Sequence, residues 1–321
     1  MDQVLQASRG FPQFVELVRQ FQIKDQDPAL LEFAIQNSTN AAGVDAARLI
    51  LENRDFELLS ASLTGTNLAA SIKLTEALGN VAANEIVSLL EPIVADSHND
   101  LLLRKQAVRS LAKMQAGASA LLKLAQSGKL PADLKFLASA ELQNARWPKI
   151  KSEATELFPL PQAKNSQALP PVSELLKMKG SSKNGEEIFA REDVGCIKCH
   201  QVNGRGIDLG PNLSEIGAKL GKDALYEAIL DPSAGISFGY ETYQIELKNG
   251  DEAFGLLASE TVDEIAVKAQ TGIVSKYKKS EIAKREQQKI SIMPAELQQA
   301  MSTQDLVDLI EYLSSLKKAS Q

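Results

Sequence analysis

The first half of the chain carries the hydrophobic spacing of helices. Between about residues 11 and 156, apolar side chains recur every three or four positions in segments of about 10 to 15 residues, separated by Asn, Asp, Gly or Pro. This spacing places the apolar side chains on one face of a helix. Strand-like alternation is missing from this half of the sequence. The pattern therefore predicts a succession of helices joined by short turns.

Three of these predicted helices share a pattern of three residues at fixed spacing. A basic or small polar residue is followed by Ala or Leu three positions later and by Leu four positions after that, and the pattern recurs after 33 and then 31 residues. A period in this range is typical of an α-solenoid, in which each helix pair buries its apolar face on its neighbours. Residues 1–160 resemble HEAT-like repeats, and an irregular helical bundle is the alternative. The pattern consists of Ser71, Leu74 and Leu78, then Arg104, Ala107 and Leu111, then Lys135, Ala138 and Leu142.

A polar, proline-bounded stretch separates the two halves. Residues 161–172 contain QAKNSQALPP, a composition typical of a linker. The remainder, residues 173–321, is predicted to begin and end with helices, the last of which Thr303 could cap. The helices predicted there are Val172–Lys179, Asn184–Arg191, Lys222–Leu230 and Thr303–Lys317.

Residues from about 240 to 292 alternate between apolar and polar side chains instead. YETYQIEL and EAFGLLAS flank Asn249-Gly250, a pair that supplies the positive φ angles of a type I′ hairpin turn. Two more strands are predicted at EIAVKAQ and IVSKYKK, with Thr271-Gly272 between them. We therefore expect a small antiparallel sheet inserted between helical segments, in a protein that is otherwise mainly α.

Composition limits the possible functions. The chain has 321 residues and is 44% hydrophobic, which is enough for two domains with their own cores. The first 160 residues hold 16 basic and 18 acidic side chains, and the rest hold 19 and 23. Nucleic-acid binding requires clustered positive charge, so that function is not expected. A transmembrane helix needs about 20 apolar residues, and no stretch approaches that length.

Cysteine and histidine point to one local site. Cys196 and Cys199 are the only cysteines, and His200 follows directly, while the only other histidine is His98. Two residues between the cysteines allow both sulfurs to reach the two vinyl positions of one porphyrin, and the adjacent histidine can then ligate the iron. This is the attachment pattern of a c-type haem.

Three other interpretations of these residues are a zinc site, a redox-active dithiol and a chance occurrence. A structural zinc site normally has four protein ligands, and His98 is the only candidate of these residue types left elsewhere. A redox-active dithiol of the thioredoxin kind lies at a helix start after a strand, and no strand is predicted before Cys196. A chance occurrence is the third alternative.

The neighbouring residues carry a family resemblance. NGEEIFAREDVGCIKCH, followed by Gly210-Pro211-Asn212-Leu213, resembles a class I cytochrome c. More narrowly, residues from about 184 to 316 resemble the haem-binding domain of the Pirellula/Verrucomicrobium type. The matching stretches are GPNL, EAILDPSAGISFGYETYQIELKNG, SIMP and DLVDLIEYL. The resemblance implies a cytochrome c fold for residues 173–321, after HEAT-like repeats.

The same resemblance implies roles for two further residues. The carbonyl of Pro211 is expected to accept the Nδ1 proton of His200 and so to orient its ring. Met293, in SIMP, is expected to be the second axial ligand of the iron, whereas Met301 is expected to pack or to lie on a helix. His98 is expected to be structural or exposed, with bis-histidine ligation as the alternative.

These residues predict an electron carrier with one covalent haem c. The resemblance implies that it exchanges electrons with a redox partner protein or with a fused dehydrogenase domain. A periplasmic or other extracytoplasmic location is expected because covalent haem attachment requires export, although the N-terminal MDQVLQASRGFPQF lacks the pattern of a secretory signal.

Two other functions remain as alternatives. One is a haem enzyme or a peroxide- or gas-reactive haem with an open sixth position, although no distal His, Arg or Trp group is recognised in the second half. The other is a redox-sensing scaffold whose solenoid surface binds a partner. Lys276, Lys278 and Lys279 are interpreted as a solvated strand face, with a docking patch for an acidic partner as the alternative.

Overall fold

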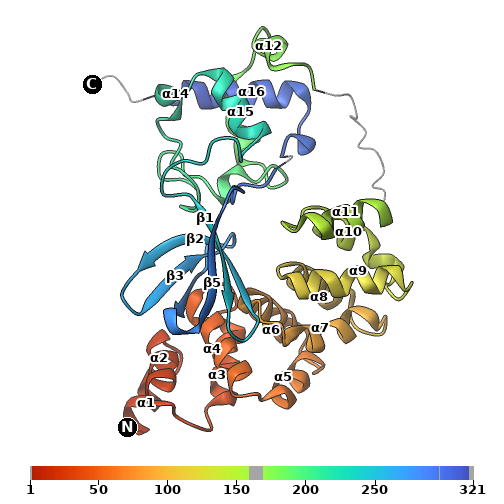
Figure 1. The fold of residues 1–321 in the computed structure, drawn as a ribbon, viewed down its shortest axis with the longest axis vertical. Helices are drawn as coiled ribbons and strands as arrows, with labels where there is room; N and C mark the ends of the chain where they lie inside the picture. The colour runs from red at the N-terminus through yellow and green to blue at the C-terminus, as the bar shows by residue number, and fades with distance from the viewer. Residues whose placement is uncertain (1, 159–168, 296, 318–321) are drawn as a thin grey trace.

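Helices fill the N-terminal half, and helices with one inserted sheet fill the C-terminal half (Figure 1). The computed structural model describes residues 2–158, 169–295 and 297–317. Most of the predicted linker at residues 161–172 lies outside the described residues. The N-terminal helices are α1 (Asp2–Ser8), α2 (Pro12–Phe21), α3 (Asp27–Gln36), α4 (Ala41–Glu52), α5 (Phe56–Leu63), α6 (Leu68–Val81), α7 (Ile86–Ala95), α8 (Leu101–Ala112), α9 (Gln115–Gln126), η1 (Ala132–Leu134), α10 (Lys135–Gln143) and α11 (Pro148–Leu157).

Short polar side chains start several of these helices. Each accepts a hydrogen bond from a free backbone N–H in the first turn, which typically stabilises a helix by about 1 kcal/mol. This explains why Asn and Asp separate the apolar segments of the sequence. The capping side chains are Asn40, Asp55, Asn67 and Asp100.

The repeated pattern lies on helices that pack side by side. Helices α6, α8 and α10 carry its three copies, and α8 packs against both α6 and α10. The apolar members of all three copies are buried. Lys135 is exposed, whereas Arg104 is buried and forms two hydrogen bonds with Asp133, at 3.0 and 2.7 Å. The N-terminal helices follow one another along the chain in a curved row (Figure 1).

The C-terminal half has a core of its own. The short α12 ends four residues earlier than predicted, and α13 packs closely on α16. A Cβ atom at Gly185 would lie 2.1 Å from the Asp308 carbonyl oxygen, so glycine permits this approach. The cap prediction was wrong: Ser302 forms a capping box with Asp305 and caps α16. The helices are α12 (Val172–Leu175), α13 (Ser182–Ala190), η2 (Cys196–Lys198), α14 (Ile216–Lys219), α15 (Lys222–Leu230), η3 (Lys279–Glu281), η4 (Leu297–Ala300) and α16 (Thr303–Ser315).

The inserted sheet is antiparallel, with strand order β4-β3-β2-β1-β5. Four strands coincide with predicted segments. The edge strand β5 was not predicted, because its sequence IAKREQQ is polar and mostly exposed, and its pairing with β1 holds it in the sheet. The strands are β1 (Thr242–Leu247), β2 (Glu252–Glu260), β3 (Glu264–Lys268), β4 (Val274–Lys278) and β5 (Ile282–Gln288).

The first hairpin turn differs from the prediction. A type I′ turn needs positive φ at both central residues, but of the described turn residues 248–251 only Gly250 has one, at +90°. The Gly250 N–H donates to the Leu247 carbonyl at 2.9 Å. The loop therefore has three residues, with glycine at the left-handed position that this type of loop requires.

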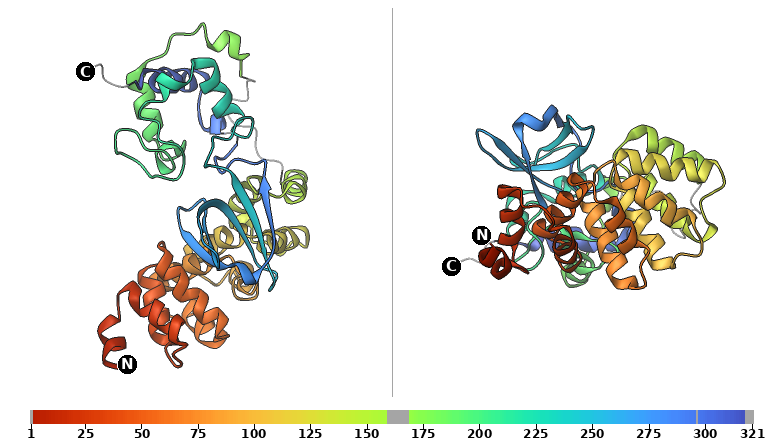
Figure 2. Two further views of the ribbon diagram at one scale, coloured as in Figure 1. Left: turned by 60° about the vertical axis from the view of Figure 1, so that its left-hand side comes forward. Right: turned by 90° about the horizontal axis from the view of Figure 1, so that it is seen from below.

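The sheet packs across the row of N-terminal helices (Figures 1 and 2). The Arg48 guanidinium, on α4, lies 5.2 Å from the centre of the Tyr277 ring. After α6, Asn84 donates its backbone N–H to Asp251 Oδ1 at 2.8 Å and its side chain to the Gly250 carbonyl at 2.7 Å. Ile273, directly before β4, is buried in the hydrophobic cluster of the N-terminal helices. The insert therefore joins the two halves of the chain.

Arg146, between α10 and α11, also contacts the sheet. Its guanidinium lies 4.2 Å from the Trp147 ring centre and 4.7 Å from that of Phe254, and its Nη2 lies 3.4 Å from Glu252 Oε2. Burial lowers the pKa of Arg146 to about 10, and Glu252 opposes that change. The side chain therefore links a turn of the helical row to strand β2.

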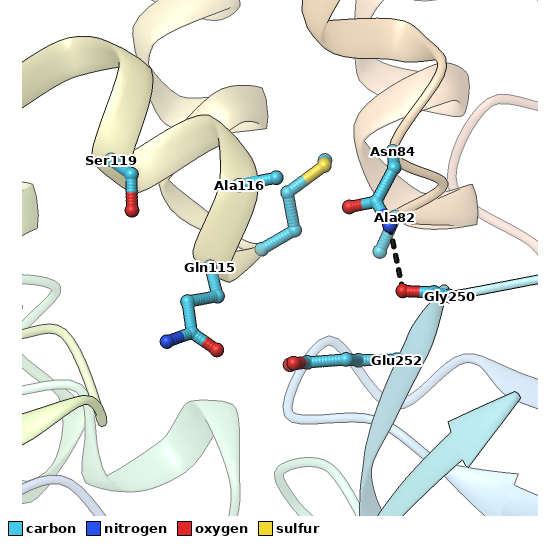
Figure 3. A pocket seen from close by; sticks show the side chains of 8 residues that line it. Ala82, Asn84, Gln115, Ala116, Ser119, Gly250 and Glu252 are labelled. Carbon is cyan, nitrogen blue, oxygen red and sulfur yellow. Dashed lines mark hydrogen bonds between the residues drawn. The ribbon is translucent and has the colours of Figure 1, made fainter. Parts of the chain in front are cut away.

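A cavity of about 310 Å³ remains beside the β1–β2 turn (Figure 3). Gln115 and Ser119 of α9 line one side, and Glu252 lines the other. The side chains of Gln115 and Glu252 point toward each other across it (Figure 3). The contact between the sheet and the helical row thus combines polar contacts, such as those of Asn84, with the apolar contact of Ile273, and it leaves a cavity beside the turn.

Replacing Arg146 by Ala is expected to lower the free energy of unfolding by about 2 kcal/mol. The substitution removes two cation–π contacts and leaves the partly buried Glu252 carboxylate without its cation. Urea unfolding followed by the fluorescence of Trp147, the chain's single tryptophan, measures the change. Arg19→Ala is the control, because it breaks a more exposed ion pair with Asp45 and should cost less than about 1 kcal/mol. Equal losses for the two variants would contradict this account.

Candidate functional site

The two cysteines lie on one short turn after α13. Cys196 begins the 3₁₀ turn η2, and Gly195 before it has φ of +77°, a conformation that favours glycine. The Cys196 carbonyl accepts the backbone N–H groups of Cys199 at 3.1 Å and of His200 at 2.9 Å. The turn therefore brings both thiols and the imidazole together within five consecutive residues.

The loop after the turn folds back along it. The Cys199 carbonyl accepts the N–H groups of Leu209 at 3.0 Å and Gly210 at 2.7 Å, and Ile207 donates to the Ile197 carbonyl at 3.1 Å. These bonds bring the backbone of Gly210 and Pro211 beside the His200 ring.

The His200 ring is held by the backbone of this loop. Its Nδ1 lies 2.8 Å from the Pro211 carbonyl oxygen. A carbonyl oxygen can only accept, so Nδ1 carries the proton and Nε2 keeps a free lone pair. Burial lowers the pKa of His200, and the bond to Pro211 opposes that change. The neutral ring thus presents Nε2, the form of histidine that ligates a metal.

Gly210 makes room for this ring. A Cβ atom at position 210 would lie 2.6 Å from His200 Cε1 and 2.9 Å from Nδ1. Both distances are far shorter than a normal contact, so any larger residue would displace the imidazole. The Gly-Pro pair therefore provides the space as well as the acceptor.

The thiols do not resemble those of a redox-active dithiol. Both are free and partly buried. Burial raises the pKa of the Cys196 thiol to about 11 and also raises the pKa of Cys199. Reactive dithiols have lowered pKa values instead, and here a helix rather than a strand precedes the turn. The geometry thus disfavours the thioredoxin-like alternative.

The zinc alternative would need further ligands. Within residues 2–158, 169–295 and 297–317, no group of three or more His, Cys, Asp and Glu side chains is arranged to hold a metal ion. His98 is 94% exposed, in the loop between α7 and α8, and its Nδ1 lies 2.8 Å from Asp96 Oδ1.

Met293 and Met301 occupy different environments. Met293 is partly buried and packs against the hydrophobic cluster that Cys196 and Ile197 also contact. Met301 is 7% exposed and belongs to the interior of that cluster. Met293 is therefore the methionine with a partly accessible side chain on the same cluster as the cysteine turn.

A second apolar cluster at the site was not predicted from the sequence. Leu256 of strand β2, Leu209 and Ile292 are buried together, and Cys199 and Tyr240 pack on them. The alternation of apolar and polar residues in β2 predicted a strand with two different faces. It did not predict which face lies against the cysteine turn. The inserted sheet therefore forms part of the site.

Two of the three lysines at 276, 278 and 279 pair with acids. Lys279 Nζ lies 2.7 Å from Glu260 Oε1, and Lys278 Nζ lies 3.9 Å from Glu281 Oε1. These ion pairs reduce the local positive charge, which favours the solvated-face interpretation over a docking patch.

The residues present fit a covalently bound haem c. Two free thiols lie on one turn, Nε2 of the adjacent imidazole is free to bind iron, Gly210 leaves space at the ring, and apolar side chains surround the turn. This donor set is that of the c-type attachment pattern.

Comparison with known families agrees with the site. Residues 182–266 match the family model Cytochrome c. The match includes the cysteine turn and Pro211 but ends before Met293. No curated protein matches the chain. The match to residues 182–266 indicates that the chain contains a cytochrome c domain, and proteins of this family bind haem c covalently.

None of the helices in the part that the structure describes is long and apolar enough to cross a membrane.

In the haem-free chain, His200 is expected to be the Nδ1–H tautomer, and Gly210→Ala is expected to abolish its bond to Pro211. Long-range ¹H–¹⁵N NMR of the two histidines measures both effects. The control is Gly235→Ala, because a Cβ there meets nothing within 4 Å. An Nε2–H tautomer in the unmodified chain, or an unchanged His200 spectrum in Gly210→Ala, would contradict the geometry.

Proposed function

We propose that the protein is an electron carrier with one haem c, bound through Cys196 and Cys199 and ligated by His200 and Met293. The observation that carries the proposal is the His200 Nδ1 to Pro211 bond of 2.8 Å beside the paired thiols, inside the segment that matches Cytochrome c. A hydrogen bond of this kind fixes the ring and strengthens the histidine as a ligand.

Each residue has a distinct part in this proposal. Cys196 and Cys199 form thioether bonds that fix the position of the group, and Pro211 orients His200. The Met293 thioether would be the second protein ligand of the iron, and it would favour the ferrous state relative to a second imidazole. When bound, the haem supplies a one-electron couple. With His200 and Met293 both as ligands, the iron would have no open position for a substrate.

The N-terminal helices serve as a scaffold in this proposal. Residues 1–160 form a HEAT-like repeat unit, and residues 173–321 form the haem domain of the Pirellula/Verrucomicrobium type. The buried, regularly spaced pattern on α6, α8 and α10 supports the repeat assignment. The electron donor or acceptor is a redox partner protein or a fused dehydrogenase domain, in the periplasm or another extracytoplasmic compartment.

Export of the chain together with haem-attachment machinery is expected to give one covalent, low-spin haem. A haem stain after denaturing electrophoresis detects the covalent bonds, and oxidised and reduced absorption spectra report the spin state. Cys196→Ser combined with Cys199→Ser should abolish the stain. A stained but high-spin protein would instead indicate an open sixth position, and an unstained protein would refute haem attachment.

Met293→Leu is expected to remove the far-red band that marks methionine-to-iron ligation, because leucine has no thioether. Met301→Leu makes the same chemical change inside the core, where this swap is well tolerated. It should therefore keep the band. Loss of the band in Met301→Leu alone would assign the ligand to Met301 instead.

A further inference from the structure

The inserted sheet makes a hydrogen bond to each of the two segments that carry the axial ligands. Lys268, the last residue of β3, donates its Nζ to the carbonyl of Asp208. Asp208 lies three residues before Pro211, in the loop that holds His200. Two residues farther on, Gln270 donates its Nε2 to the carbonyl of Ile292 at 3.2 Å, and Ile292 directly precedes Met293.

Apolar packing joins the same two segments to the same part of the sheet. Leu256 of β2 is the register partner of Lys268. It is buried in one cluster with Leu209, from the His200 loop, and Ile292, from the Met293 segment. One cross-strand pair thus contacts both sides of the site.

The sheet is well suited to hold a fixed distance at this point. Strand β3 is paired on both sides, by β2 and β4. A Cβ atom at Gly255 would lie 2.2 Å from the Lys268 carbonyl oxygen, so β2 and β3 approach closely where Lys268 leaves the strand. The Thr242 hydroxyl of β1 donates to the Ile290 carbonyl at 2.5 Å and ties the Met293 segment to the sheet a second time.

We propose that Lys268 and Gln270 are positioning residues that use the sheet as a spacer to fix the His200 loop and the Met293 segment relative to each other. The inference rests on the proposed haem ligation. Neither side chain would be an iron ligand, and each acts through a backbone carbonyl of the segment that carries one, Asp208 or Ile292. The inserted sheet would thereby set how firmly Met293 binds the iron.

Lys268→Met and Gln270→Met test the proposal, because methionine is an unbranched side chain of similar length that lacks the hydrogen-bond donor. In the exported, haem-loaded chain, the affinity for added imidazole is expected to rise about tenfold in the double variant, since the sheet then loses one hydrogen bond to the His200 loop and one to the Met293 segment. The reduction potential should shift as well. Lys268→Arg keeps a hydrogen-bond donor at this position. It should therefore bind imidazole with the normal affinity, unlike Lys268→Met.

Lys276→Met and Gln287→Met are the matched controls, because they make the same changes at exposed positions of β4 and β5.

A second readout is amide hydrogen exchange in the haem-free chain. The Gly210 amide should exchange faster in Lys268→Met, and the Met293 amide should exchange faster in Gln270→Met. Normal covalent haem with unchanged imidazole affinity in the double variant would overturn this inference alone. Absence of covalent haem in the unmodified chain would overturn the proposed function and this inference with it.

Discussion

The bond between His200 Nδ1 and the Pro211 carbonyl is the constraint on which the site depends. It sets the tautomer, leaves Nε2 free to bind a metal, and requires the loop of residues 207–213 to lie against the cysteine turn. That approach is possible because Gly210 has no side chain to meet the imidazole. The thiols, the ring and the acceptor thereby form one unit within sixteen residues of sequence, from Cys196 to Pro211.

The inserted sheet connects this unit to the rest of the molecule. Near the site, strands β2 and β3 contact the His200 loop and the segment before Met293. Elsewhere the same sheet rests on the helical row, through the Asn84 hydrogen bonds and the Arg146 contacts with Glu252 and Phe254. The sheet is thus continuous between the helical row and the two segments next to His200 and Met293.

Local chemistry was predictable from the sequence, and long-range packing was not. The spacing of Cys196, Cys199 and His200 indicated the chemistry because it depends on neighbours in the chain. Strand β5 was missed because its side chains are polar and only its pairing with β1 orders it. The docking of the sheet on the helical row was missed for a related reason: Arg146 and Glu252 are 106 residues apart, and each is an ordinary charged residue in its own segment.

The most direct test of the account is proton NMR of the reduced, exported chain with ¹³C-labelled methionine methyl groups. The haem ring current strongly shifts the methyl group of an axial methionine, so it separates that residue from the other methionines. The account predicts one such methyl resonance, absent in Met293→Leu and present in Met301→Leu. A covalently attached haem with no shifted methionine methyl would contradict His200 and Met293 as the axial pair.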